Sequence, residues 1–156
     1  MALSIATGAA LAACGGGGAA VEGACAPEVM EALDPGSARH VLPGAPEPPY
    51  ASDPPTSGAH LPGTEAQGAL RRPLARPEQV AVLEEGGVLV QYRDLADRDR
   101  RRLEGLAAED VVVAPNGQLD APVVATAWRY RLRCTAVDPG ALQRFVDAHR
   151  GGGPGP

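Results

Sequence analysis

The chain has 156 residues, of which 21% are charged, and a formal net charge of −5 at pH 7. This length is typical of one domain with short tails, and the lack of a basic excess argues against a nucleic-acid-binding protein. One Trp and one Phe stand beside many aliphatic residues, so we expect a core built mainly from Val, Leu and Ala.

The N-terminus predicts export. Residues 1–13 form a short run of small and apolar residues that ends in Leu11-Ala12-Ala13, directly before Cys14. This pattern resembles a bacterial lipoprotein signal peptide, which implies cleavage before Cys14, acylation of this cysteine and attachment to a membrane of the cell envelope. The run is too short to span a bilayer as a helix. Because residues 1–4 carry no Arg or Lys, a plain secreted or cytosolic N-terminus is the alternative.

The remaining cysteines also favour export from the cytosol. If Cys14 is lipidated, Cys25 and Cys134 are an even pair, and in an oxidising compartment we expect them to form a disulfide. Such a bond closes a loop of roughly a hundred residues, which the chain-entropy model values at about 4 kcal/mol. In the cytosol both would instead be unpaired thiols. Residues 14–26 are rich in Gly and Ala and are expected to form a tether between the anchor and the domain.

Patterns of apolar, Gly and Pro residues predict the elements of a domain over residues 27–150 and a disordered tail over 151–156. In chain order they are a short helix over 27–33, an irregular Pro-rich wrap over 37–76, strands over 79–83 and 87–92, a helix over 95–108, strands over 111–114 and 122–130, and a last helix capped by Asp138 and begun by Pro139. A loop as long as the wrap usually serves a function.

From residue 87 onward the predicted order is strand, helix, strand, strand, helix. The helix between the first two strands requires a parallel crossover, and the third strand is expected to be an antiparallel neighbour. We therefore expect a single small α/β or α+β domain with a mixed sheet. The same order occurs in the second half of thioredoxin-like folds. The chain has no Cys-x-x-Cys, so thiol chemistry is not part of this analogy.

The most distinctive segment is Pro54-Pro55-Thr56-Ser57-Gly58-Ala59-His60. The prolines fix φ and remove two amide donors, and the residues after them supply turn chemistry, so His60 is presented on a rigid loop. An imidazole held with small positional error suits a metal ligand or a general base. The alternative is a structural loop in which His60 bonds a backbone carbonyl. Ser57 is interpreted as a typical turn residue rather than a nucleophile, because the sequence has no nucleophile-elbow motif and no orienting acid after it.

Together with Leu83-Glu84-Glu85-Gly86 and Trp128, this segment resembles the bacterial family named domain of unknown function 3105, over residues 34–154. The family's PPTSGPH motif stands here as residues 54–60, with Ala59 in place of proline. Its second hallmark resembles H-x-L-E-H-G, and in this chain Ala81 and Glu85 replace the two histidines.

The resemblance implies a set of histidines, at the positions of His40, His60, Ala81 and Glu85, that is able to bind copper or zinc. In this chain His40 and His60 remain, and Glu84 and Glu85 are carboxylate candidates. The expected metal site is therefore His40, His60 and Glu85. The alternative is that the replacement of two histidines has removed the site and left these residues a structural role.

These observations favour an anchored lipoprotein whose domain binds a protein partner in the cell envelope, and no catalytic residue is assigned. The second hypothesis is a metal-binding protein or metalloenzyme that uses zinc or copper, which requires the three expected ligands to converge. A third is a thioredoxin-like scaffold with a peptide-sized groove beside the sheet edge. His149, near the end of the last helix, is expected to be an ordinary surface histidine.

Overall fold

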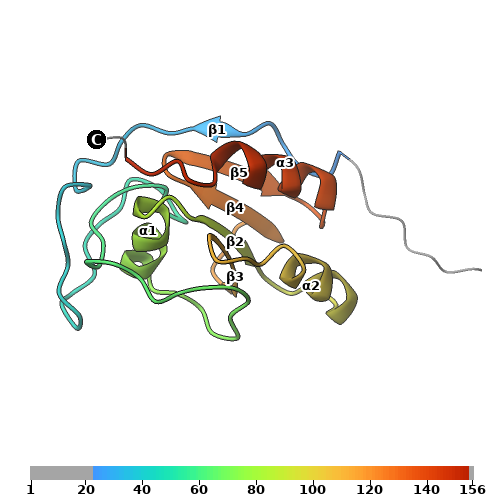
Figure 1. The fold of residues 1–156 in the computed structure, drawn as a ribbon, viewed down its shortest axis with the longest axis horizontal. Helices are drawn as coiled ribbons and strands as arrows, with labels where there is room; N and C mark the ends of the chain where they lie inside the picture. The colour runs from blue at the N-terminus through green and yellow to red at the C-terminus, as the bar shows by residue number, and fades with distance from the viewer. Residues whose placement is uncertain (1–22, 155–156) are drawn as a thin grey trace, which may run out of the picture.

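A five-stranded mixed sheet runs through the protein, as seen in a computed structural model that describes residues 23–154 (Figure 1). In chain order the elements are β1 (Val29–Met30), α1 (Arg76–Glu84), β2 (Val88–Tyr92), α2 (Asp97–Glu104), β3 (Val111–Pro115), β4 (Val123–Ala127), β5 (Tyr130–Cys134) and α3 (Pro139–His149). The strands lie in the order β1-β5-β4-β2-β3. The expected single small domain with a mixed sheet and a long irregular wrap is confirmed.

The central strands run in the predicted directions. β2 pairs in parallel with β3, from Val88 opposite Val111 to Tyr92 opposite Pro115, and α2 lies in the crossover between them. β4 runs antiparallel to both β2 and β5. All residues of β2 are buried, which is the near-continuous apolar pattern expected of a strand covered on both faces of its sheet.

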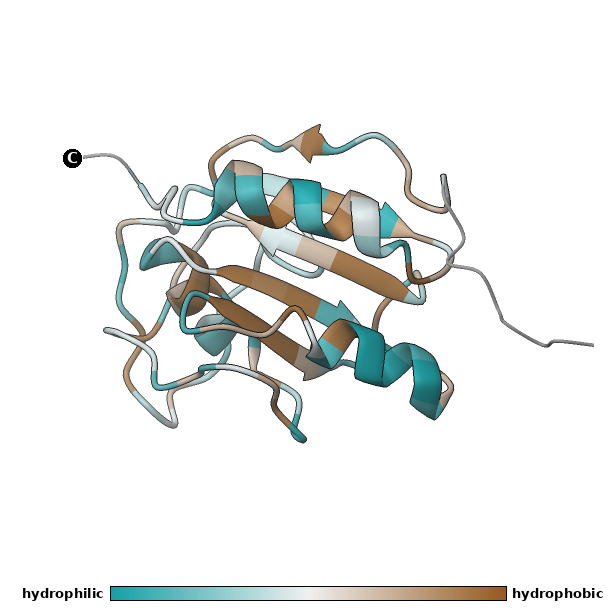
Figure 2. Ribbon diagram, turned by 45° about the vertical axis from the view of Figure 1, so that its right-hand side comes forward, coloured by the Kyte–Doolittle hydropathy of each residue, from teal (hydrophilic) through white to brown (hydrophobic). Residues whose placement is uncertain are grey.

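The core has two separate parts on the two faces of the sheet, and Figure 2 shows that the central strands between them are mainly hydrophobic. Because successive side chains of a strand point to opposite faces, β2 contributes to both parts. One part lies under α2 and α3 and includes Val88, Val90, Leu103, Leu142 and Phe145. The other lies under α1 and the wrap and includes Val80, Leu83, Leu89, Val112 and Trp128. The core is mainly aliphatic, as the composition predicts.

Residues 23–34, which we call the strap, run along β5 at the edge of the sheet (Figure 1). Cys25 and Cys134 form the predicted disulfide, across a sequence separation of 109. The residues of β1 pair antiparallel with Arg131 and Tyr130. The strap is therefore fastened to β5 both covalently and through its backbone.

The predicted helix over 27–33 is wrong, because this segment belongs to the strap. A helix of seven residues has too few internal hydrogen bonds to be stable by itself. The strap finds its partners on the sheet instead: Ala26 N donates to Arg133 O at 2.9 Å and Glu31 N donates to Arg129 O at 2.7 Å. Pairing at long range has overridden a local helical pattern.

The predicted strand over 79–83 is also wrong, because these residues lie in α1. Pro77 stands in the first turn of the helix, and the Glu78 carboxylate accepts a hydrogen bond from Ala75 N at 2.9 Å. Residues 80–83 are all buried. A short segment that is apolar on every side has no period that separates a buried helix from a strand.

The single strand predicted over 122–130 is a hairpin of β4 and β5. Its turn contains Arg129 with a φ of 68°, a left-handed conformation that non-glycine residues rarely adopt. Arg129 N donates to Thr56 O at 2.8 Å, and its Nε donates to Glu31 O at 3.1 Å. The turn is held by the strap and the wrap, which is why no Asn or Gly marks it in the sequence.

The predicted cap of the last helix is confirmed. Asp138 accepts a hydrogen bond from Ala141 N at 2.9 Å, and this backbone contact holds the pKa of the carboxyl below its usual range. The same side chain accepts from Gly23 N at 2.9 Å and so also holds the start of the strap. α2 is shorter than the predicted helix over 95–108.

Residues 151–153 pack against the turn between α1 and β2, where a disordered tail was expected. Gly151 N donates to Gly86 O at 2.8 Å. A Cβ on Gly153 would lie 2.6 Å from Glu84 O, so only glycine permits this approach. None of the helices between residues 23 and 154 is long and apolar enough to cross a bilayer.

Candidate functional site

The segment Pro54–His60 lies in the wrap, and its two hydroxyl groups fasten it to the strap. Thr56 Oγ1 donates to Glu31 Oε2 at 2.8 Å, and Ser57 Oγ accepts from Asp34 N at 2.9 Å. Both side chains are buried. Buried hydroxyls need hydrogen-bond partners, and these partners come from the strap. Ser57 is therefore engaged in a structural contact rather than presented as a nucleophile.

Asp34, which the sequence did not single out, organises the beginning of the wrap. Its Oδ1 accepts from Gly36 N at 2.7 Å and its Oδ2 accepts from Ala51 N at 2.8 Å. The carboxylate is buried between the two segments that it joins. The sequence Asp34-Pro35-Gly36 is typical of a local turn, but the contact with Ala51 joins distant residues and leaves no sequence pattern.

Tyr50 packs against the glycine of the same segment. Gly58 has a φ of 133°, and a Cβ at this position would lie 2.8 Å from the Tyr50 ring. The Tyr50 hydroxyl donates to Ala59 O at 2.7 Å. Burial, with smaller contributions from the charges of Glu47 and Asp34, raises the pKa of Tyr50 to about 12. The motif thus requires glycine because an aromatic ring occupies the space beside it.

His60 is the one member of the segment that keeps an unused polar atom. Its ring is 3% exposed, and its Nδ1 lies 2.9 Å from Gly58 O. A carbonyl oxygen only accepts, so in the neutral imidazole Nδ1 carries the proton and Nε2 keeps a lone pair. This Nε2 is buried and has no hydrogen-bond partner among the described residues.

The structure brings His40 and His60 together. Their backbones form a parallel bridge in which Val41 N donates to His60 O at 2.7 Å and His60 N donates to Arg39 O at 3.1 Å. The two rings stand edge to face with centroids 5.0 Å apart. The ring of His60 is buried, whereas His40 is exposed.

Glu85 follows the last residue of α1, whereas the residue after His60 contacts the first turn of this helix. Leu61 N donates to Pro77 O at 3.2 Å, and Thr64 N donates to Glu85 Oε1 at 3.1 Å, so residues 61–64 run along the helix from its first turn to its last. Pro77 and Glu85 are eight residue steps apart, which places their backbones about 12 Å apart along the helix axis at 1.5 Å per residue. Within residues 23–154, no three His, Cys, Asp or Glu side chains are grouped so that they could hold a metal ion.

Glu85 instead lines a pocket of about 550 Å³ together with Glu109 and Asp110. The pocket lies at the amino ends of β2 and β3, beside Gly87 and Val112. Ligands of open sheets with parallel strands usually bind at the opposite, carboxyl ends.

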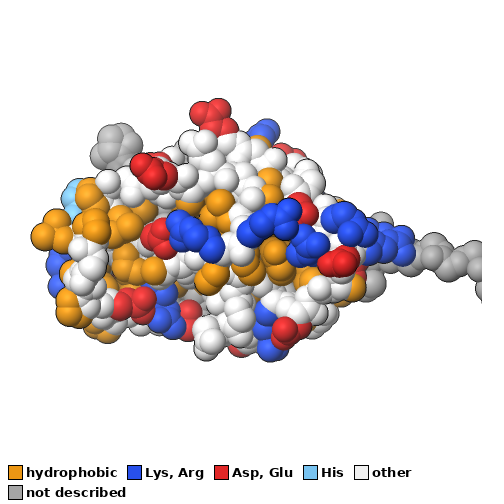
Figure 3. Space-filling model, turned by 90° about the horizontal axis from the view of Figure 1, so that it is seen from below, with side chains coloured by type: hydrophobic (Ala, Val, Ile, Leu, Met, Phe, Trp, Pro, Cys, Tyr) orange, Lys and Arg blue, Asp and Glu red, His pale blue; other side chains and the backbone are white. Residues whose placement is uncertain are grey.

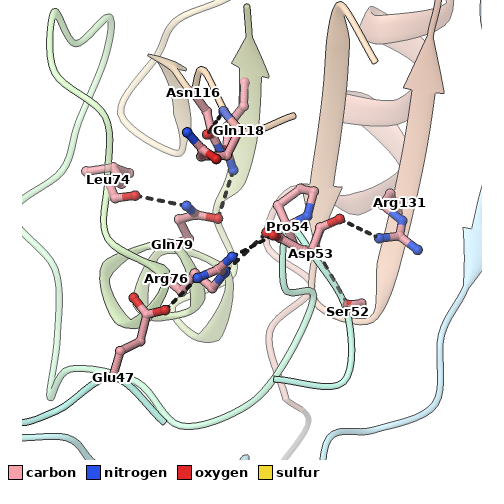
Figure 4. A network of polar contacts seen from close by, with 11 residues as sticks. Glu47, Ser52, Asp53, Pro54, Leu74, Arg76, Gln79, Asn116, Gln118 and Arg131 are labelled. Atoms are coloured by element: carbon pink, nitrogen blue, oxygen red, sulfur yellow. Dashed lines mark hydrogen bonds and ion pairs between the residues drawn. The ribbon is translucent and has the colours of Figure 1, made fainter. Parts of the chain in front are cut away.

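A network of ion pairs closes the wrap over the first turn of α1 (Figure 4). The guanidinium of Arg76 contacts Glu47 and Asp53, each at 2.6 Å. These hydrogen bonds raise the pKa of Arg76, and the bond to Asp53 makes the larger contribution. The peptide bond between Asp53 and Pro54 is cis, and Arg131 Nη1 donates to Asp53 O at 3.3 Å. The sequence did not reveal these contacts, because residues that are distant along the chain form them.

A chain of hydrogen-bonded side-chain amides lies beside the ion pairs of Arg76. Gln79 donates to Leu74 O at 2.9 Å and accepts from Gln91 Nε2 at 3.1 Å, and Gln91 in turn accepts from Asn116 Nδ2 (Figure 4). Both glutamines are buried, and each finds its partners within the chain. The network satisfies polar groups in the interior.

The other residues of the expected site have structural positions. Glu84 is the last residue of α1, and Gly86, two residues later, has a φ of 85°. Trp128 is 8% exposed and belongs to the part of the core under α1. Cys14, the expected lipidation site, lies outside the described residues.

Charge on the visible surface is mixed. Figure 3 shows arginines and carboxylates interspersed across the face that is seen from below. On α2, Arg100 contacts Asp97 at 3.0 Å and Glu104 at 2.7 Å, and Arg102 contacts Asp99 at 3.2 Å.

Residues 46–156 match the family described as "Protein of unknown function (DUF3105)". The match covers more than half of the chain, and the chain belongs to this family. It includes the segment Pro54–His60 and the whole sheet except β1, whereas His40 and Cys25 precede it. Comparison with curated proteins and with solved structures gave no match.

The tight contact at Gly58 predicts a large loss of stability in Gly58→Ala. The added methyl group would overlap the Tyr50 ring and require a φ that alanine disfavours, so we expect a loss of about 1–3 kcal/mol or more in the free energy of unfolding. Urea denaturation measures this loss. Gly117→Ala is the matched control, because a Cβ there meets nothing within 4 Å. Equal midpoints for the two variants would contradict the described packing.

The raised pKa of Tyr50 predicts a late step in the alkaline titration. Burial favours the neutral phenol, so the stability that this group contributes is present below pH 10 and is lost as pH rises through about 12. Ultraviolet absorbance of tyrosinate measures the titration, and Tyr50→Phe is expected to remove the step near pH 12. A Tyr50→Phe variant with an unchanged titration curve would show that Tyr50 is not the buried phenol.

Proposed function

We propose that this protein is an exported lipoprotein, anchored to a membrane of the cell envelope through Cys14, and that its domain binds a protein partner there. The observation that carries the proposal is the disulfide between Cys25 and Cys134. Disulfides form and persist in oxidising compartments and are rare in the cytosol. Cys14 is then the only cysteine left over, and it directly follows the small apolar run of residues 1–13.

The proposed anchor keeps the domain close to the membrane. Nine residue steps separate Cys14 from Gly23, the first described residue, and at no more than about 3.6 Å per residue they span at most about 32 Å. Gly23 is held by Asp138, and the strap begins there. The surface nearest to the anchor along the chain is therefore the strap itself.

Binding rather than catalysis is favoured by the state of the polar groups. Ser57 Oγ is bonded to the strap, and His60 Nδ1 is bonded to a backbone carbonyl, so these two groups do not form a nucleophile and base. By contrast, the strap exposes large apolar side chains: Val29 is 54% exposed, Met30 is 59% exposed and Leu33 is 52% exposed. β1 also lies at the open edge of the sheet. Exposed apolar groups on an edge strand are features of protein contact surfaces.

Mass spectrometry of the protein, expressed from its own gene, tests the anchor. We expect the membrane fraction to contain a chain that begins at Cys14, carries acyl groups and has its other two cysteines oxidised. Cys14→Ser is the control and is expected to lose the acyl groups and to keep residues 1–13. A wild-type chain that is unprocessed, soluble and rich in free thiols would contradict export and anchoring together.

Photo-crosslinking tests the binding surface in the same cells. A photoreactive amino acid in place of Met30 is expected to give a discrete adduct with an envelope protein, because this side chain is exposed on β1. The same residue in place of Gln118, which is exposed in the turn before β4, is the matched control and should give none. No adduct at Met30, or the same adduct at both positions, would count against the strap as the contact surface.

A further inference from the structure

The unpartnered nitrogen of His60 is the starting point. Its ring is held by the contact of Nδ1 with Gly58 O at 2.9 Å, and its Nε2 is buried without a partner among the described residues. A buried polar atom without a hydrogen-bond partner is energetically unfavourable. A histidine whose one ring nitrogen donates to a backbone carbonyl while the other keeps a free lone pair has the arrangement of a metal ligand.

The second ligand is His40. The parallel bridge between the two residues fixes their backbones side by side, and the rings lie with centroids 5.0 Å apart. Two imidazole nitrogens bound to one metal ion at about 2.0–2.1 Å lie at most about 4 Å apart. The ring centroids lie farther from the ion than the nitrogens do, so a centroid separation of 5.0 Å is compatible with a shared ion. His40 is exposed and no hydrogen bond holds its ring within the described part of the chain, so it can rotate toward an ion beside His60.

We propose that His40 and His60 form a two-histidine copper site. Copper(II) binds most tightly among the divalent first-row ions at a given nitrogen site, and imidazole is one of its preferred ligands. Zinc sites usually need three or four protein ligands, and residues 23–154 offer no third His, Cys, Asp or Glu beside this pair. In this proposal water or a donor group from another molecule completes the coordination of the ion.

The site is independent of the proposed anchor. It uses neither Cys14 nor the strap's exposed side chains, so copper binding and membrane attachment can each fail without the other. Glu85 is not a ligand in this proposal, because its carboxylate is held by Thr64 N at the far end of α1.

Copper titration of the full chain tests the proposal. Cys14→Ser is used as the background, because a free thiol would compete for copper, and the affinity is measured by calorimetry against a competing chelator. We expect one Cu²⁺ per chain, with zinc bound more weakly. His40→Ala should weaken binding by at least about tenfold, since changes to groups that merely support a ligand already cost 10–100-fold. His60→Gln should abolish binding.

Two matched variants complete the design. His149→Ala removes the third histidine of the chain, which stacks on Tyr130 and contacts Glu28, and should leave the affinity unchanged. Glu85→Gln should also leave it unchanged. The electron paramagnetic resonance spectrum should show nitrogen coupling that is reduced in His40→Ala. Because His40 is exposed, that variant is expected to fold even if His60→Gln does not.

The outcomes are distinct. Stoichiometric binding that depends on His40 and not on His149 supports the site. Absence of copper binding by the wild-type residues, or an undiminished affinity in His40→Ala, overturns it. A loss in Glu85→Gln as large as that in His40→Ala would overturn the two-histidine composition.

Discussion

The attachment of the strap and the wrap to the β4–β5 hairpin is the constraint on which the rest of the structure depends. More than forty residues precede α1 with almost no regular secondary structure, and their backbone groups must still find partners when buried. The hairpin supplies many of them: Arg133 and Arg129 accept from the strap, and Arg129 donates to Thr56. The disulfide makes one end of this attachment covalent.

This constraint explains why the most distinctive segment of the chain is mainly structural. In Pro54–His60, Thr56 and Ser57 bond the strap and Gly58 accommodates the ring of Tyr50. The rigidity that suggested a functional loop is real, but most of it serves to dock one irregular segment on another. Within this segment, only His60 has a buried side-chain atom, Nε2, that lacks a hydrogen-bond partner.

Sequence patterns located the regular half of the fold better than the irregular half. β2, β3 and α3 were predicted because each carries a local signal: an apolar run, or a cap such as Asp138 followed by proline. α1 was mistaken for a strand because burial on all sides erases the helical period. The strap and the turn at Arg129 were missed because contacts between distant residues determine their conformations.

The candidate site was predicted only in part, because it too depends on contacts between distant residues. The motif identified His60, and the parallel bridge that brings His40 beside it is a long-range pairing that no local pattern reports. The inclusion of Glu85 relied on a resemblance along the sequence, which contains no information about distance. In the structure Glu85 follows the last turn of α1, about one helix length from the first turn, which Leu61 contacts. Its carboxylate accepts a hydrogen bond from Thr64 N.

The geometry of α1 also bears on positions 81 and 85, at which the family resemblance implies histidines. Pro77, Ala81 and Glu85 are spaced four residues apart, so they share the side of the helix along which residues 61–64 run. Histidines at positions 81 and 85, as the family resemblance implies, would form a pair on one helix face. Position 85 lies about 12 Å along the helix axis from Pro77, whose carbonyl oxygen accepts the hydrogen bond from Leu61 N. In this chain Ala81 and Glu85 stand at these two positions, whereas both His40 and His60 are present and are joined by the parallel bridge.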